Sequence, residues 1–164
     1  MAAEPTCPNC GRDFVRRSHR QGIFERLISV IYVYPFRCQL CLHRFLTLQL
    51  GKRFIKQKVD RREYERIETK LPLAFKGDQA QGEGTAIDLS MAGCAVESDV
   101  KVPEGSLVQL ELKNAPAAPV KVEAAVVRST RQRTIGLQFL RLREEEKERL
   151  RQFVRQLLQS RRPK

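Results

Sequence analysis

Two short cysteine motifs constrain this chain more than any other feature of its sequence. Four of its five cysteines form two C-x-x-C pairs, Cys7 with Cys10 and Cys38 with Cys41. The N-terminal residues carry no secretion signal, so we expect a cytoplasmic protein, where such pairs are typical of metal sites rather than disulfides. Two C-x-x-C turns can direct four thiolates at one ion from about 2.3 Å, which favours zinc; an iron–sulfur centre is the alternative.

The segments around the two pairs, "CPNCGRDF" and "CQLCLHRF", look like the two knuckles of a zinc ribbon. Four protein thiolates leave no open coordination position, so the predicted zinc is structural. A fold of about 40 residues usually needs such a staple. The second knuckle has Leu42 where ribbons often have glycine, and the neighbouring His43 is expected to pack beside the site.

The segment between the pairs, "GIFERLISVIYVYPF", predicts a short helix, although its β-branched residues favour a strand. A helix would place apolar side chains on one face: Ile23, Phe24, Leu27, Ile28 and Ile31. We expect this face to pack in a core, with contact at a membrane interface as the alternative. The longest apolar run is about half of the roughly 20 residues that span a bilayer, so no transmembrane segment is expected.

The rest of the chain alternates apolar and polar residues with a period of two. This pattern predicts half-buried strands over residues 71–75, 108–112, 120–126 and 135–139. Turn-forming sequences separate them, among them "KGDQAQGEG" and "DLSMAGC". Short, evenly spaced strands predict a closed antiparallel barrel or a sandwich.

The end of the chain changes to a helical period. Its apolar stripe consists of Leu150, Phe153, Val154, Leu157 and Leu158. Glu144 to Glu146 would lie in the first turn, where acidic groups complement the helix dipole. We expect this helix to pack on the outside of the barrel. The fifth cysteine, Cys94, is expected to be a buried, inert thiol.

Two polar motifs flank the beginning of the β-rich part. Arg62-x-x-x-Arg66 precedes the first strand, and Asp88-x-Ser90-x-x-Gly93 follows about 22 residues later. Over residues 58–160 the chain resembles the PilZ domain family, which has these two motifs in this order. The resemblance implies a mainly β fold, a small antiparallel barrel of about six strands with a C-terminal helix. The predicted domains are a zinc ribbon at 1–50, a basic linker at 51–60 and the barrel with its helix at 61–164.

The same resemblance implies a receptor for cyclic di-GMP, a bacterial second messenger with two phosphates and two guanines. Its binding residues would be Arg61, Arg62, Arg66, Asp88, Ser90 and Gly93. A guanidinium can form paired hydrogen bonds with a phosphate or with guanine O6 and N7. A carboxylate can accept from the adjacent N–H donors of guanine, a hydroxyl can donate to a phosphate, and a glycine permits close approach of the backbone.

The net charge of +12 favours anionic partners and is concentrated at the N-terminal end. Residues 1–58 hold 11 basic and 3 acidic residues. Binding of nucleic acid through the basic ribbon is therefore the alternative function, although aromatic residues, on which bases stack, are sparse and tryptophan is absent. No nucleophile with a plausible base and no open metal site is visible, so we do not expect an enzyme. A protein partner for the ribbon or the barrel is expected.

The segment from Gly51 to Arg66 joins the predicted ribbon to the barrel and is densely basic up to Lys58. Like charges in a linker repel one another, so we expect the segment to be mobile without ligand. We hypothesise that cyclic di-GMP orders this segment and thereby exposes or covers the basic ribbon, which would be the surface that passes on the signal.

Overall fold

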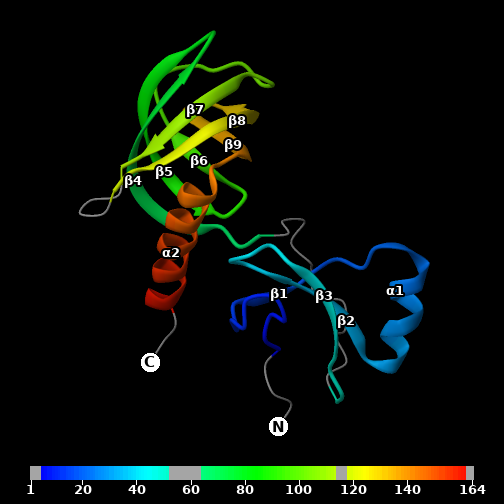
Figure 1. Cartoon of the computed structure of the whole chain (residues 1–164). Helices are drawn as coiled ribbons and strands as arrows, with labels where there is room; N and C mark the ends of the chain where they lie inside the picture. Colours follow the sequence, from blue (N-terminus) through cyan, green and yellow to red (C-terminus); the bar gives the residue numbers. More distant parts are fainter. Residues whose placement is uncertain (1–4, 52–63, 114–117, 162–164) are drawn as a thin grey trace. The chain divides into compact units, whose positions relative to one another are not determined.

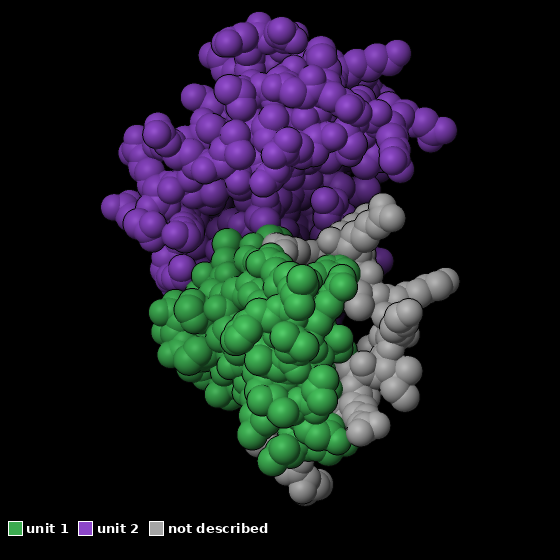
Figure 2. Space-filling model, turned by 90° about the vertical axis from the view of Figure 1, so that its right-hand side faces the viewer, with its two compact units in different colours: residues 1–65 green, residues 66–164 purple. Residues whose placement is uncertain are grey.

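The computed structural model describes residues 5–51, 64–113 and 118–161 (Figure 1). The chain divides into two compact units, Met1–Glu65 and Arg66–Lys164, coloured separately in Figure 2. Most of the predicted linker, residues 52–60, lies outside the described residues. The domain boundaries drawn from the sequence therefore stay a prediction, and so does the mobility of the linker.

The first unit is built on a small antiparallel sheet with the order β1-β2-β3. Its strands are β1 (Val15–Arg17), β2 (Val33–Cys38) and β3 (Arg44–Leu48). The helix α1 (Gly22–Ile28) and a 3-10 turn (Ser29–Ile31) lie between β1 and β2 in the chain. Within its described residues the buried apolar side chains of this unit are few: Phe14, Tyr34, Pro35, Phe36 and Leu40 accompany the cysteines Cys7 and Cys38. A core of this size is consistent with a module that needs a metal staple.

The short helix predicted between the cysteine pairs is confirmed at Gly22–Ile28, whereas residues 33–36 at the end of that segment belong to β2. The predicted packing of the helix's apolar face is wrong. Ile23, Phe24, Leu27 and Ile31 are exposed to solvent rather than buried. The helix is held instead through Glu25, whose carboxylate is buried against Arg44 of β3 at 2.7 Å. The hydrophobic period correctly indicated a helix, but the buried ion pair decides which face of it turns inward.

The second unit is a closed antiparallel barrel with the strand order β4-β5-β6-β9-β8-β7 (Figure 1). Within the described residues its strands are β4 (Ile67–Gly77), β5 (Gln81–Ser90), β6 (Gly93–Glu97), β7 (Leu107–Leu112), β8 (Val120–Arg131) and β9 (Thr134–Arg141). Alternate side chains of these strands, such as Leu71, Leu73 and Phe75 of β4, are buried. The mainly β class with a closed six-stranded barrel, predicted from the sequence, is confirmed.

Both predicted turns quoted above are partly strand: in "DLSMAGC", β5 runs to Ser90 and β6 begins at Gly93. The sequence "KGDQAQGEG" was expected to be a turn, but β5 begins at Gln81 and includes Gly82 and Gly84. A Cβ added to Gly84 would lie 2.6 Å from the carbonyl oxygen of Glu97, so the neighbouring backbone comes too close for a side chain. Glycines that signal a turn in the sequence thus mark a close approach of strands here.

The helix α2 (Glu144–Ser160) closes the second unit and packs on the outside of the barrel against β4 and β8, as predicted. Leu150, Val154 and Leu158 are its buried residues. Its N-cap position is Arg143, which makes no capping hydrogen bond, and three glutamates in its first turn complement the helix dipole. Neither this helix nor α1, the helices of the described residues, is long and apolar enough to cross a membrane.

Candidate functional site

The two C-x-x-C pairs converge on one point in the first unit. The sulfur atoms of Cys7, Cys10, Cys38 and Cys41 all lie within 4.8 Å of one another. Cys7 and Cys41 are 3.5 Å apart, and Cys10 and Cys38 are 3.6 Å apart. Four sulfurs around a tetrahedral zinc with bonds of about 2.3 Å would be about 3.8 Å from one another. The cluster therefore has the donor type, number and spacing that can hold a zinc ion.

The two knuckles have the same backbone turn despite their different sequences. Gly11 follows the first pair with φ of +67°, and Leu42 follows the second pair with φ of +64°. Such values favour glycine, and a leucine adopts them at a cost of about 1–2 kcal/mol. The Sγ of Cys38 accepts backbone N–H groups from Leu40 and Cys41 at 3.4 and 3.5 Å. The departure from the usual ribbon pattern at Leu42 thus leaves the turn geometry intact.

The thiols of the cluster differ in their acidity. Burial raises the pKa of Cys38 far above its ordinary value. Burial acts in the same direction on Cys41, but hydrogen bonds from the backbone of His43 and from the side chains of Asn9, Cys7 and Cys38 outweigh it and lower its pKa to about 7. Because thiolates are the metal-binding form, metal uptake by such a cluster releases protons.

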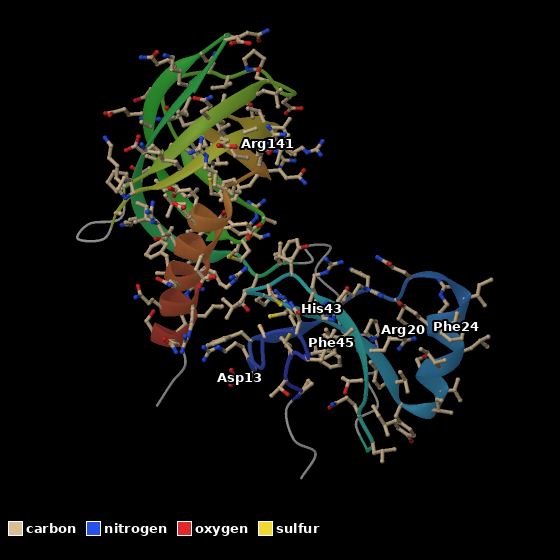
Figure 3. All side chains as sticks on the ribbon, viewed as in Figure 1. Asp13, Arg20, Phe24, His43, Phe45 and Arg141 are labelled. Carbon is tan, nitrogen blue, oxygen red and sulfur yellow. The ribbon has the colours of Figure 1, made fainter. Side chains whose placement is uncertain are left out.

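His43 and Cys94, which the sequence offered as a possible metal ligand and a lone thiol, do not belong to the four-sulfur cluster. The ring of His43 stacks on Phe45 with centroids 6.2 Å apart, as the labels in Figure 3 allow the reader to follow. Cys94 is fully buried in β6. Burial, with the nearby carboxylate of Asp88, raises the pKa of Cys94 to about 12, while Arg66 acts in the opposite direction. The expectation of packing for His43 and of a buried thiol for Cys94 is confirmed.

Two motif residues meet at the start of the barrel. Arg66, directly before β4, donates from Nη1 to both oxygens of Asp88 in β5, at 3.1 Å and 3.3 Å. The same carboxylate accepts the backbone N–H of Ala95 at 2.8 Å, beside an irregularity in the pairing of β5 with β6. Both side chains stay partly accessible, at 32% for Arg66 and 19% for Asp88. A positive and a negative hydrogen-bonding group are thus held together at a surface.

The second motif forms the hairpin that joins β5 to β6. Ser90 is buried, and its hydroxyl donates to the carbonyl oxygen of Gly93 at 3.1 Å and accepts the N–H of Ala92 at 3.3 Å. A Cβ added to Gly93 would lie 2.1 Å from the carbonyl oxygen of Leu137 in β9. The hydroxyl therefore stabilises the turn, and the glycine permits the close approach of β6 and β9.

The remaining predicted ligand residues, Arg61 and Arg62, lie outside the described residues. The structure does show what holds the end of their motif within the first unit. Arg37 donates to the hydroxyl of Tyr64 at 2.9 Å and lies over its ring, and Gln39 accepts the N–H of Glu65 at 2.7 Å. Arg37 and Gln39 could not be recognised from the sequence, because single polar side chains beside a cysteine knuckle carry no recognisable signal.

Comparison with known proteins identifies the second unit. The sequence matches the PilZ domain family over residues 60–156. The chain is similar to the solved PilZ domain of CeSA from a cellulose-synthesizing bacterium, with 16% identity and a TM-score of 0.48, over 57% of this chain and 98% of that one. It is also similar to the Bacillus subtilis inhibitor of motility (MotI/DgrA), with 19% identity and a TM-score of 0.54, over 79% of this chain and 70% of that one.

No curated protein sequence matches the chain. At 19% identity the similarity to the motility inhibitor supports the fold and nothing finer. The family match is stronger, because it covers more than half of the chain and includes both polar motifs. With its closed six-stranded barrel and its outer helix, this chain belongs to the PilZ domain family, a family of cyclic di-GMP receptors.

Proposed function

We propose that this protein is a cytoplasmic receptor for cyclic di-GMP and acts as a non-enzymatic effector in bacterial second-messenger signalling. The observation that carries the proposal is the pairing of Arg66 with Asp88 at a partly accessible surface of a PilZ barrel. The residues that would bind the ligand are those of the two motifs: Arg61, Arg62, Arg66, Asp88, Ser90 and Gly93.

The chemistry of the two paired residues suits this ligand. The guanidinium of Arg66 can form two parallel hydrogen bonds with a phosphate, or pair with guanine O6 and N7. The carboxylate of Asp88 is an acceptor and can take the adjacent N1–H and N2–H donors of guanine. Its orientation is already fixed by the N–H of Ala95, so little side-chain freedom is lost on binding.

The ligand has to compete with contacts that the protein makes within itself. The ion pair of Arg66 with Asp88 is partly exposed, and pairs of this kind contribute about 0–1 kcal/mol, so it can be rearranged at small cost. The hydroxyl of Ser90 is buried and engaged in the turn. In our proposal Ser90 and Gly93 mainly shape the hairpin that presents Asp88, and direct contact of Ser90 with a phosphate stays a prediction.

We further propose that Cys7, Cys10, Cys38 and Cys41 hold one structural zinc. The spacing of the four sulfurs supports this assignment. A metal bound by four thiolates has no open position, so its contribution is folding energy rather than catalysis. The zinc would stabilise the small sheet of the first unit, and a protein partner would bind to this unit.

Nucleic-acid binding by the ribbon is the second candidate, because residues 5–51 contain seven arginines and only two acidic residues. One contact speaks against a base-stacking surface there. The ring of Tyr34 is buried and already covered by the guanidinium groups of Arg17 and Arg20, at 4.8 and 5.7 Å from its centroid. Proteins that bind single-stranded nucleic acid without sequence preference normally stack the bases on accessible aromatic rings, and Tyr34 is not accessible.

A pair of titrations separates the two functions. Calorimetry of the full chain with cyclic di-GMP should give saturable binding that survives a moderate increase in salt. Titration with short duplex and single-stranded DNA at two salt concentrations should give weak binding that falls steeply with salt. Saturable DNA binding without any cyclic di-GMP binding would reject the receptor function and favour the second candidate.

A further inference from the structure

The first unit has an apolar surface that none of the proposed functions uses. Five side chains of α1 and the 3-10 turn after it are between 62% and 77% exposed: Ile23, Phe24, Leu27, Val30 and Ile31. Successive residues of a helix are about 100° apart around its axis, so these positions fall on one side of the helix. We call this set the α1 apolar face. Large aliphatic side chains gathered on one exposed face usually mark an interaction site.

The α1 apolar face is directed outward by a polar anchor on the opposite side of the helix. Glu25 is only 7% exposed, and its two carboxylate oxygens accept from Nη1 and Nη2 of Arg44, both at 2.7 Å. Arg44 also donates to the carbonyl oxygen of His19 at 3.0 Å, just before the helix. A helix that is attached through a buried ion pair cannot turn its apolar face inward without leaving that pair unsatisfied, which is strongly unfavourable.

The strand that carries the anchor continues the apolar surface. Arg44, Leu46 and Leu48 alternate along β3 and therefore lie on one face of the sheet. Leu46 and Leu48 are exposed, and so is Leu50 just after the strand. The first unit thus exposes leucines beside its anchor as well as the α1 apolar face.

The charge of the first unit is mostly positive. Residues 5–51 contain seven arginines, against which stand only Asp13 and Glu25, and Glu25 is buried in its ion pair. Arg20 and Arg26 are exposed, one just before α1 and one within it (Figure 3 labels Arg20 and Phe24). Aliphatic side chains bordered by arginines are typical of protein surfaces that lie in the interface of an anionic membrane.

We propose that the α1 apolar face inserts into the headgroup region of anionic lipid membranes, with Arg20 and Arg26 contacting lipid phosphates. A second copy of the chain fits the surface less well, because two such faces would bring their arginines together. Nucleic acid also fits less well, because Phe24 is the one aromatic member of the face and the rest is aliphatic. The peripheral contact proposed here needs no membrane-spanning helix.

Co-sedimentation of the zinc-loaded full chain with lipid vesicles tests this proposal. Cyclic di-GMP is left out, so the outcome does not depend on the receptor function. Vesicles that contain phosphatidylglycerol should bind the protein at least tenfold more strongly than vesicles of pure phosphatidylcholine, and high salt should weaken the binding. Equal binding to both vesicle types, or binding to neither, would overturn the proposal.

Matched variants locate the contact. The double substitution Phe24→Ser and Leu27→Ser should lower vesicle affinity at least tenfold, and Arg26→Gln should lower it a few-fold. The control is Leu107→Ser with Leu140→Ser, because these barrel leucines are similarly exposed, at 59% and 54%, and the control should bind as the parent does. Zinc content and circular dichroism verify that each variant is folded.

Two results would assign the face to another partner. Sedimentation velocity without vesicles would reveal a dimer, and a dimer abolished by the Phe24→Ser, Leu27→Ser variant would mean that a second copy occupies the face. Vesicle binding that the α1 substitutions leave unchanged would place the membrane contact elsewhere. Either result contradicts the inference.

Discussion

The guanidinium of Arg66 and the carboxylate of Asp88 lie 3.1 Å apart, although 22 residues separate them in the chain. Antiparallel pairing of β4 with β5 brings them together, since Glu68 stands opposite Asp88 in the register of the two strands. Each of these two residues belongs to one of the two PilZ motifs. Their pairing therefore joins the two halves of the proposed ligand site at one place.

We expect Arg66→Ala to weaken cyclic di-GMP binding about ten- to a hundredfold, because a hydrogen bond to a charged group contributes about 1.5–3 kcal/mol. The barrel should remain folded, since Arg66 precedes its first strand and is partly exposed. Calorimetry with the purified variant measures the effect. Arg133→Ala is the matched control, because Arg133 forms an exposed ion pair with Asp99 at the opposite end of the pairing of β6 with β9. Unchanged affinity in Arg66→Ala would remove Arg66 from the site.

We expect Asp88→Asn to lose the preference for guanine while keeping the fold. The amide oxygen can still accept the N–H of Ala95, but an amide offers one acceptor and one donor where the base presents two donors. Affinities for cyclic di-GMP and for its adenine analogue should therefore move towards each other. A variant that discriminates between them as well as the parent does would show that Asp88 does not read the base.

We expect one zinc per chain in protein purified without chelator, and loss of the fold of the first unit when the zinc is removed. Elemental analysis gives the stoichiometry, and circular dichroism before and after chelation follows the fold. Cys38→Ser should lose the metal, whereas Cys94→Ser should keep it because Cys94 lies in the barrel, outside the cluster. Substoichiometric zinc with a fold that chelation leaves unchanged would count against the site.

We expect zinc removal also to weaken cyclic di-GMP binding, by about tenfold. Arg37 and Gln39 hold Tyr64 and Glu65, the residues directly before Arg66. If the knuckle unfolds, the ligand has to order these residues itself, and fixing one residue costs about 1–2 kcal/mol. Calorimetry of zinc-loaded and zinc-free protein tests this, with Tyr64→Phe as a milder variant that removes only the hydroxyl hydrogen bond. Equal affinities with and without zinc would mean that the two units act independently.

We expect Gly93→Ala to lower the free energy of unfolding by about 3 kcal/mol, at the upper end of what overpacking costs. The added Cβ would lie 2.1 Å from the carbonyl oxygen of Leu137, and this oxygen belongs to the backbone of β9, which cannot move aside as a flexible side chain can. Thermal denaturation of the ligand-free protein measures the change. Gly105→Ala is the comparison, because nothing lies within 4 Å of its added Cβ and only the strain of a positive φ remains, about 1–2 kcal/mol. A fully stable Gly93→Ala that has lost ligand binding would mean that Gly93 serves the ligand rather than the barrel.

Several features of the fold could be predicted because they depend on local chemistry. The spacing of the cysteines predicted one cluster of four sulfurs, because the geometry of a C-x-x-C turn directs both of its thiols to the same side. Period-two alternation found strands such as β7 and β8, whose buried faces are apolar and whose other faces are polar. β5 was harder to recognise, because glycines that allow strands to approach closely read as turn residues in the sequence.

By itself the sequence determined the cysteine cluster, the barrel with its closing helix and the order of the two polar motifs. Only the tertiary structure decided what each side chain meets. It pairs Asp88 with Arg66, engages the hydroxyl of Ser90 in a turn, and turns α1 outward through Glu25 and Arg44. The physical reason is that periodicity reports which face of an element is apolar, whereas burial and ion pairing depend on partners distant in the chain, which a local pattern does not contain.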